Sequence, residues 1–177
     1  MAEQDNRLHL YMGDGKGKTT AAMGLAVRAL GQGFSVMVAQ FLKDGRSGEL
    51  RALRQLPGAK VVEVAPIGKF VFRMTEAERA EARARQCAEA ERLAALVAAE
   101  KPRLLVLDEL ALAMHMDMVS EASGWQLIEA GLACGEVAVT GRSAPESLIA
   151  RADYVSEITK RKHPYDGGLQ ARRGIEY

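Results

Sequence analysis

Short apolar runs alternate along this chain with longer amphipathic or alanine-rich stretches. Six runs have the length and apolar content of strands, at residues 8–12, 35–41, 60–65, 103–107, 136–140 and 154–158. Between them, helices are predicted over 19–30, 48–56, 75–100 and 144–151. Strands that alternate with helices in this way predict an α/β fold with a mostly parallel sheet and helices on both faces.

The longest predicted helix, 75–100, has the clearest pattern. Its apolar stripe includes Cys87, Ala90, Ala94 and Val97, at spacings of three and four residues. Thr75 and Glu78 have the spacing of a capping box at its start, and Pro102 ends it. The chain contains no internal repeat, low-complexity block or obvious linker, so residues 1–177 are predicted to form a single domain.

Composition narrows the class of protein. Lys and Arg number 24 against 23 Asp and Glu, a net charge of +1, which argues against a nucleic-acid coat or a protein of anionic membrane surfaces. No apolar run approaches the ~18–20 residues of a membrane helix. The N-terminus is polar with no signal-peptide core, and Cys87 and Cys134 lie far apart. We expect a cytoplasmic protein with neither a nucleic acid nor a membrane as partner.

The first predicted strand runs into Gly13-Asp14-Gly15-Lys16-Gly17-Lys18-Thr19-Thr20, and a helix follows. Glycines let backbone N–H groups turn toward an anion, and a helix N-terminus adds positive potential. Lys18 would contact phosphate oxygens, and the Thr19 hydroxyl would reach a divalent cation. The strict phosphate-loop pattern needs glycine at position 12, which is Met12, so Gly13 begins a shorter form. A plain glycine-rich turn would not explain Lys18 and Thr19, and we interpret the segment as a nucleotide phosphate site.

Asp108 and Glu109 end an apolar strand, where a carboxylate can hold Mg²⁺ opposite Thr19. The sequence does not decide which of the two contacts the metal. Arg28, on the first helix, is a candidate for nucleotide contact or for a surface position. Arg142, after the strand 136–140, could reach the nucleotide or a second substrate, or could lie on the surface. The three histidines lack metal-ligand spacing, and no serine or cysteine nucleophile motif is present. The basic run Lys160-Arg161-Lys162-His163 is either a solvated stretch or a neutraliser of phosphate.

Four segments occur in an order that resembles a known family: GDGKGKTTAA, LDEL, VTGR and HPYDGG…ARRGIEY. Together they resemble the ATP:cob(I)alamin (corrinoid) adenosyltransferases of the CobA/CobO type. Residues 67–72 resemble that family's Gly-x-Gly-Phe-Thr-Trp stretch. The resemblance covers essentially the whole chain, and a shortened phosphate loop is typical of the family.

The resemblance implies a P-loop, RecA-like fold, a homodimer, and transfer of the 5′-deoxyadenosyl group of ATP to cobalt(I) of a corrinoid with release of triphosphate. It implies Mg²⁺ or Mn²⁺ as cofactor and a flavoprotein that supplies electrons. Residues 13–20 would form the ATP loop, with Arg28 on the nucleotide. Thr19 and Glu109 would hold the metal, and Phe70 and Phe72 would meet the corrinoid ring.

Two residues depart from the family pattern. Asp14 stands where Asn is common, which adds negative charge near phosphate, and Phe72 stands where Trp is common. Phe70 and Phe72 as ordinary core residues is an alternative, as is a phosphotransferase, an NTPase or a non-hydrolysing nucleotide-dependent module for the whole chain. The sequence also leaves open whether the corrinoid is cobalamin or an a,c-diamide precursor, and whether the ribose of ATP faces it.

Overall fold

The computed structural model describes residues 6–43, 45 and 47–175. Its strands form one sheet in the order β3-β2-β4-β5-β1-β6, and every pairing is parallel. They are β1 (Leu8–Met12), β2 (Val36–Gln40), β3 (Ala59–Val62), β4 (Leu104–Asp108), β5 (Glu136–Thr140) and β6 (Tyr154–Glu157). The predicted parallel α/β architecture is confirmed.

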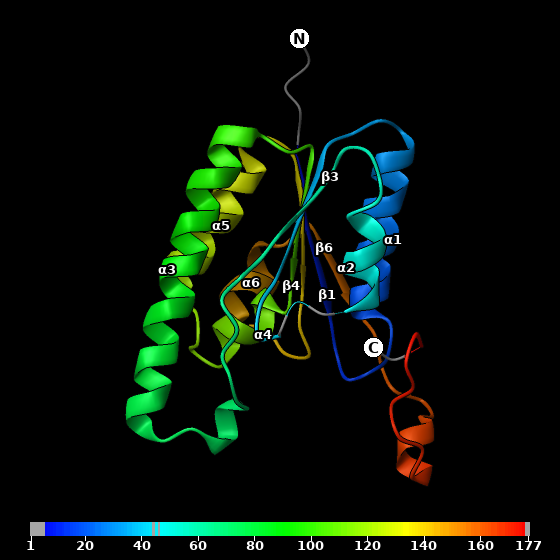
Figure 1. The fold of residues 1–177 in the computed structure, drawn as a ribbon, viewed down its shortest axis with the longest axis vertical. Coiled ribbons are helices and arrows are strands. Elements are labelled where there is room, and N and C mark those ends of the chain that lie inside the picture. The colour runs from blue at the N-terminus through cyan, green and yellow to red at the C-terminus, as the bar shows by residue number, and fades with distance from the viewer. Residues whose placement is uncertain (1–5, 44, 46, 176–177) are drawn as a thin grey trace.

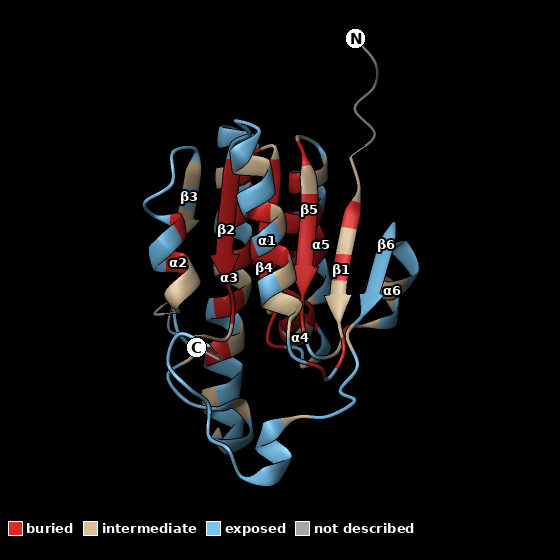
Figure 2. Cartoon of the chain, turned by 90° about the vertical axis from the view of Figure 1, so that its right-hand side faces the viewer, coloured by how far each residue is buried: buried red, intermediate tan, exposed pale blue. Residues whose placement is uncertain are grey.

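Helices cover both faces of the sheet, which Figure 1 shows edge-on between two helical layers. On one face, α1 (Lys18–Gly31) and α2 (Gly48–Leu53) enclose one apolar cluster. On the other, α3 (Glu76–Glu100), α4 (Leu110–His115), α5 (Glu121–Leu132) and α6 (Glu146–Arg151) enclose a larger one. The central strands β2 and β4 are buried along their whole length (Figure 2). No helix in the described part of the chain is long and apolar enough to cross a membrane.

Helix α3 begins as predicted. The Thr75 side chain accepts a hydrogen bond from the Glu78 N–H at 3.3 Å, and the Glu78 carboxylate accepts one from the Thr75 N–H at 2.8 Å. This is the reciprocal capping box. Ala90, Ala94 and Val97 of the predicted stripe are buried, and Cys87 is half-buried.

Two predicted elements end three residues earlier than expected, and two helices were missed. The strand predicted over 60–65 stops at Val62, because the carbonyl groups of Glu63 and Ala65 accept hydrogen bonds from the α3 side chains Arg92 and Gln86. The helix predicted over 48–56 ends at Leu53, where turn hydrogen bonds follow. Helices α4 and α5 lie in a region for which the sequence pattern gave no helix.

Because all pairings are parallel, the carboxyl ends of the strands meet at one edge of the sheet. Two single-turn 3₁₀ segments, η1 (Val71–Arg73) and η2 (Pro164–Gly167), extend beyond this edge, at the lower left and lower right of Figure 1. Strand β5 lies between β1, which leads into the glycine-rich loop, and β4, which ends in Asp108. The fold therefore gathers the ends of β1, β5, β4 and β2 beside one another.

Candidate functional site

The phosphate loop, residues 13–20, is fixed against the end of β6. Gly13 has φ 108° and Gly17 φ 127°, conformations that favour glycine. A Cβ on Gly13 would lie 2.5 Å from the carbonyl oxygen of Ile158, and one on Gly15 would lie 2.7 Å from it. The Gly15 N–H donates to that same oxygen at 2.7 Å. The close approach of two backbones explains why side chains are excluded here.

Lys18, the first residue of α1, places its ammonium group within the loop. Its Nζ donates to the carbonyl oxygen of Gly15 at 2.8 Å. Partial burial lowers the pKa of Lys18, and the nearby Glu109 carboxylate acts in the opposite direction. The N-terminus of α1 has no side-chain cap and no acidic residue in its first turn, so its positive potential is available to an anion.

Asp14 is turned toward the C-terminal segment. Its Oδ1 accepts a hydrogen bond from the Lys160 backbone N–H at 2.9 Å, and this bond is the main reason that the pKa of Asp14 is lowered. The carboxylate therefore stays ionised at the loop, as the sequence predicted, and it also joins the loop to the segment that follows β6. Lys16 and Thr20 are exposed.

Asp108 is fully buried, and each of its two carboxylate oxygens accepts two hydrogen bonds. The Thr19 and Thr140 hydroxyls donate to Oδ1 at 2.8 and 2.7 Å, and Gln40 Nε2 and Lys43 Nζ donate to Oδ2 at 2.8 Å each. Burial acts to raise the pKa of Asp108, but the Lys43 charge and the hydrogen bonds together lower it. The ionised Asp108 carboxylate therefore holds four side chains of the site together.

Glu109 differs from Asp108 in both its hydrogen bonding and the direction of its pKa shift. Its backbone is left-handed, with φ 61°, and its N–H donates to the Thr140 hydroxyl oxygen at 3.0 Å. Its Oε2 atom is buried and has no hydrogen-bond partner among the described residues. Burial, followed by the negative charge of Asp108, raises the pKa of Glu109. Of the two carboxylates, Glu109 is the one with an oxygen free for a ligand.

Sequence reasoning missed three members of this network. Gln40 ends β2, Lys43 follows it, and Thr140 ends β5. A polar residue that closes a buried parallel strand is the signal that could have identified Gln40 and Thr140, because such residues meet at one edge of the sheet. Lys43 lies in a predicted loop and carries no comparable signal.

The residues present fit a divalent cation. The Thr19 hydroxyl gives its hydrogen to Asp108 and keeps lone pairs for a metal, and Glu109 adds a carboxylate oxygen without a partner. Within the described ranges, no group of three or more His, Cys, Asp or Glu side chains could hold a metal. A cation here would therefore need further oxygens from a bound phosphate or water.

The structure brings one of the two candidate arginines to the loop. The carbonyl oxygen of Arg142 accepts the Gly13 N–H at 3.2 Å, and the charge of Arg142 acts to lower the pKa values of both Asp14 and Lys18. Arg28 lies ten residues after Lys18 on α1, about 15 Å along the helix axis. Burial raises the pKa of Tyr11, and the positive charge of Arg28 acts in the opposite direction.

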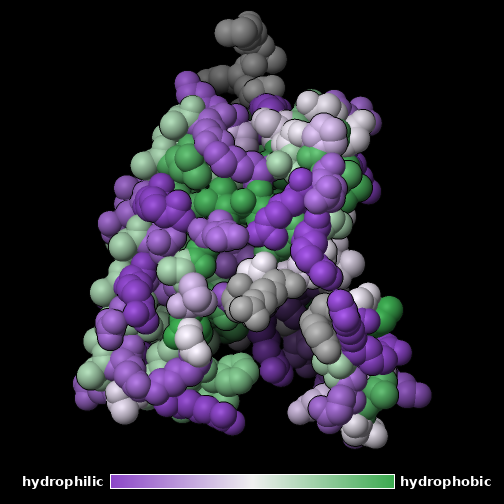
Figure 3. Space-filling view, viewed as in Figure 1, coloured by the Kyte–Doolittle hydropathy of each residue, from purple (hydrophilic) through white to green (hydrophobic). Residues whose placement is uncertain are grey.

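Phe70 and Phe72 are not core residues, so that alternative is wrong. They are 65% and 78% exposed in the segment that links β3 to α3. Their rings stack with centroids 5.4 Å apart, and the Arg73 guanidinium lies 5.9 and 5.6 Å from them. Figure 3 shows an open notch between the lobe built from the start of α3 with η1 and the C-terminal lobe. The segment that carries the two rings thus forms part of the lobe on one side of this notch.

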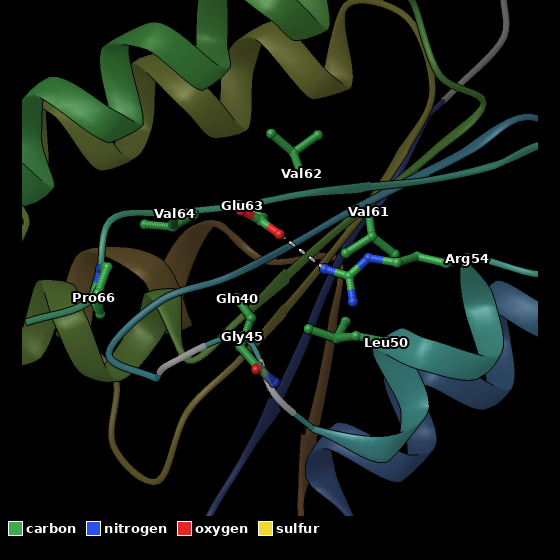
Figure 4. A pocket seen from close by; sticks show the side chains of 9 residues that line it. All are labelled: Gln40, Gly45, Leu50, Arg54, Val61, Val62, Glu63, Val64 and Pro66. Atoms are coloured by element: carbon green, nitrogen blue, oxygen red, sulfur yellow. Dashed lines mark hydrogen bonds and ion pairs between the residues drawn. The ribbon is translucent and has the colours of Figure 1, made fainter.

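A cavity of about 270 Å³ lies between α2, the end of β2 and β3 (Figure 4). The Arg54–Glu63 ion pair, at 3.4 Å, crosses it. The cavity lies at the β3 end of the sheet, whereas β1, which leads into the phosphate loop, lies near the opposite end. Gln40 lines the cavity and also donates to Asp108, which joins this space to the carboxylate network.

Two comparisons of the sequence with known proteins indicate the same family. The family model described as ATP:corrinoid adenosyltransferase BtuR/CobO/CobP matches residues 4–177. A corrinoid adenosyltransferase of Pseudomonas aeruginosa is 35% identical over 171 residues, which are 96% of this chain and 83% of that protein. The corrinoid adenosyltransferase CobA of Salmonella typhimurium is 32% identical over 175 residues, covering 99% and 87%. A solved structure of EssC (ATPases 2 and 3) from Geobacillus thermodenitrificans superposes with a TM-score of 0.50 at 20% identity, over 97% of this chain and 35% of that one, and indicates the fold alone.

Proposed function

Since this chain belongs to the ATP:corrinoid adenosyltransferase family, we propose that it transfers the 5′-deoxyadenosyl group of ATP to cobalt(I) of a corrinoid. The observation that supports this most directly is the hydrogen bond from Thr19 of the phosphate loop to Asp108, at the end of β4, in a chain of that family. Cobalt(I) attacks the C5′ carbon with its electron pair. A Co–C bond forms, the C5′–O5′ bond breaks, and triphosphate leaves with the electrons of that bond.

The chain's own work in this reaction is positioning and charge stabilisation. Cobalt(I) is itself a strong nucleophile, so no activated serine, cysteine or general base is needed. Negative charge develops on the leaving triphosphate, where the Lys18 ammonium and the N-terminus of α1 would stabilise it. Arg142, beside the loop, is positioned to add a further positive charge.

A divalent cation, Mg²⁺ or Mn²⁺, is proposed between the Thr19 hydroxyl and the Glu109 carboxylate. When bound, it would supply positive charge to the phosphate oxygens. Asp108 then acts through Thr19 and Thr140, which it orients, and Lys43 and Gln40 hold Asp108 in place.

Phe70 and Phe72 are proposed to meet the corrinoid. Their exposed rings at the carboxyl edge offer apolar surface without a lone pair. Packing such rings where an axial ligand of cobalt would sit excludes that ligand and water, which eases reduction of cobalt(II). We further propose a homodimer, a cytoplasmic location and a flavoprotein as electron source. The nucleotide contact of Arg28 stays a prediction, since Arg28 lies about 15 Å along the α1 axis from Lys18.

Anaerobic incubation with ATP, Mg²⁺ and chemically reduced cobalamin tests the proposal. The expected products are intact triphosphate and a light-sensitive Co–C bond in the visible spectrum. Stoichiometric ADP without alkylcobalamin would instead indicate a phosphotransferase or NTPase. Parallel reactions with the a,c-diamide precursor would establish which corrinoid reacts faster.

A further inference from the structure

Lys43 reaches the carboxylate network from a strained turn after β2. The strand ends at Gln40, and the Phe41 N–H still donates to the Asp108 carbonyl oxygen at 2.9 Å, so the chain stays paired with β4 up to Phe41. Leu42 then has a left-handed backbone, with φ 56°, which is uncommon for a residue other than glycine and has a conformational cost. Its side chain packs against the larger apolar cluster. Core packing therefore holds the turn that Lys43 directly follows.

The Lys43 ammonium group forms an ion pair with the buried carboxylate of Asp108. Its Nζ lies 2.8 Å from Asp108 Oδ2, and Oδ1 of the same carboxylate accepts the Thr19 hydroxyl at 2.8 Å. Because one carboxylate makes both contacts, Lys43 Nζ lies no more than about 8 Å from the Thr19 hydroxyl oxygen. Burial raises the pKa of Glu109, and the charge of Lys43 is the largest influence in the opposite direction. Lys43 is thus close to both residues proposed to hold a cation.

The charges of the groups around Thr19 and the Glu109 carboxylate cancel. Asp108 and Glu109 supply two negative charges when both are ionised. Lys43 and Lys18 supply two positive charges, and both act on the Glu109 carboxylate. Proteins that hold a free divalent cation tightly surround it with several carboxylate oxygens, and a set of groups without net negative charge lacks the main attraction for such an ion. Removal of the Lys43 charge would leave this set with a net negative charge.

We propose that Lys43 makes cation binding at Thr19 and Glu109 depend on the nucleotide, because it neutralises the carboxylate pair until a triphosphate supplies negative charge of its own. This deepens the function proposed above and rests on the metal site proposed there. A divalent cation without nucleotide meets groups of no net charge and few free ligand oxygens. ATP brings several negative charges together with phosphate oxygens, which supply both the attraction and the missing ligands. Positive charge is then added to the site only when a leaving group is present to be stabilised.

Mn²⁺ serves as the probe, and its binding to the full chain is measured by water-proton relaxation with and without ATP. The unmodified chain is expected to bind Mn²⁺ weakly without ATP. Lys43→Gln keeps a hydrogen-bond donor for Asp108 and removes the charge. This variant should bind Mn²⁺ without ATP at least about fivefold more tightly at low ionic strength, the change that a unit charge about 8 Å from a divalent cation produces in water. Lys43→Met should show a similar gain, and Lys43→Arg, which keeps the charge, should show none.

Lys60→Gln is the matched control, because it changes the net charge of the chain by the same amount. Lys60 lies in β3 near the amino ends of the strands, where it forms an ion pair with Glu100. This variant should bind Mn²⁺ as the unmodified chain does. Addition of Glu109→Gln to Lys43→Gln should abolish the gain, which would place the cation at Glu109. A loss of folding would remove the site, so it cannot imitate an increase in affinity.

Three results would overturn the inference and leave the proposed function standing. The unmodified chain could bind Mn²⁺ equally tightly with and without ATP. It could hold Mn²⁺ with ATP while Lys43→Gln and Lys43→Met show no gain without ATP. The gain in Lys60→Gln could equal that in Lys43→Gln, which would assign the effect to overall charge. If the chain holds no Mn²⁺ even with ATP, the proposed metal site fails and the inference with it, whereas adenosyl transfer is tested separately by its products.

Discussion

Asp108→Asn and Glu109→Gln are adjacent, nearly isosteric changes, and the structure predicts that only Asp108→Asn lowers stability. Asp108 is buried and accepts four hydrogen bonds, one of them from a lysine. Losing its charge weakens charge-assisted bonds that are worth about 1.5–3 kcal/mol. Removing one partner of a fully buried ion pair costs about 3–5 kcal/mol. The cost here is smaller, because the Lys43 side chain is 35% exposed and water screens its charge. We expect a loss of about 2–3 kcal/mol, which for a chain of this length lowers Tm by about 4–12 °C.

Glu109→Gln removes a carboxylate whose buried oxygen has no partner in the described part of the chain. The pKa of Glu109 is raised in the folded state, so its ionised form disfavours folding once the pH exceeds the unfolded value. Glutamine has no such penalty, and Tm at pH 7 should stay equal or rise. The Mg²⁺ concentration needed for half-maximal transfer should rise, because the metal loses its charged ligand.

The pH dependence gives an independent check. The pKa of Asp108 is lowered on folding, so its stabilisation is present above the unfolded pKa and is lost as the pH falls through the folded one. The Tm deficit of Asp108→Asn should therefore shrink in acid. Any Tm gain of Glu109→Gln should shrink too, since Glu109 becomes protonated in both states.

Thermal unfolding without nucleotide or metal, followed by Mg²⁺ titration of the reaction, measures both effects. Asp117→Asn is the control, because Asp117 pairs with Arg83 at 3.0 Å on the exposed surface and its loss should leave Tm nearly unchanged. A stable Asp108→Asn variant with an altered Mg²⁺ titration, beside a destabilised Glu109→Gln variant, would refute the assignment of anchor and ligand.

Three further predictions concern the loop and the aromatic pair. Lys18→Ala should lower turnover by at least roughly 10²-fold while Tm stays within a few degrees, and near-normal rates would remove Lys18 from the reacting phosphates. Gly15→Ala should weaken ATP binding and lower Tm, because its Cβ meets Ile158, whereas Gly24→Ala on an open face of α1 should raise stability by about 0.5–1 kcal/mol. Phe70→Ala, and less strongly Phe72→Ala, should impair reaction that starts from cobalt(II) far more than reaction from pre-formed cobalt(I). Equal losses in both assays would contradict the proposed exclusion of an axial ligand.

Local sequence signals were sufficient where a short apolar run, a glycine-rich loop or a capping box identifies the element by itself. Strands β1 and β5, the phosphate loop and the capped start of α3 lie where the pattern predicted them. Helix α5 was missed because Gly124 and Gly131 normally indicate a break. In the structure these glycines allow close packing: a Cβ on Gly124 would lie 2.6 Å from Met114, and one on Gly131 would lie 2.6 Å from Val137. Their role depends on packing against neighbouring elements, here α4 and β5, which the pattern within one helix does not contain.

The distinction between Asp108 and Glu109 depends on the order of the strands. Sequence places both carboxylates at the carboxyl edge and cannot separate them, since they are consecutive. The sheet inserts β5 between β1 and β4, and this brings the Thr140 hydroxyl to Asp108 at 2.7 Å and to the Glu109 N–H at 3.0 Å. Strand β2, on the other side of β4, contributes Gln40 and is followed by Lys43. With its oxygens occupied from both neighbouring strands, Asp108 has no site left for a metal, and the left-handed turn at Glu109 makes that carboxylate the available one.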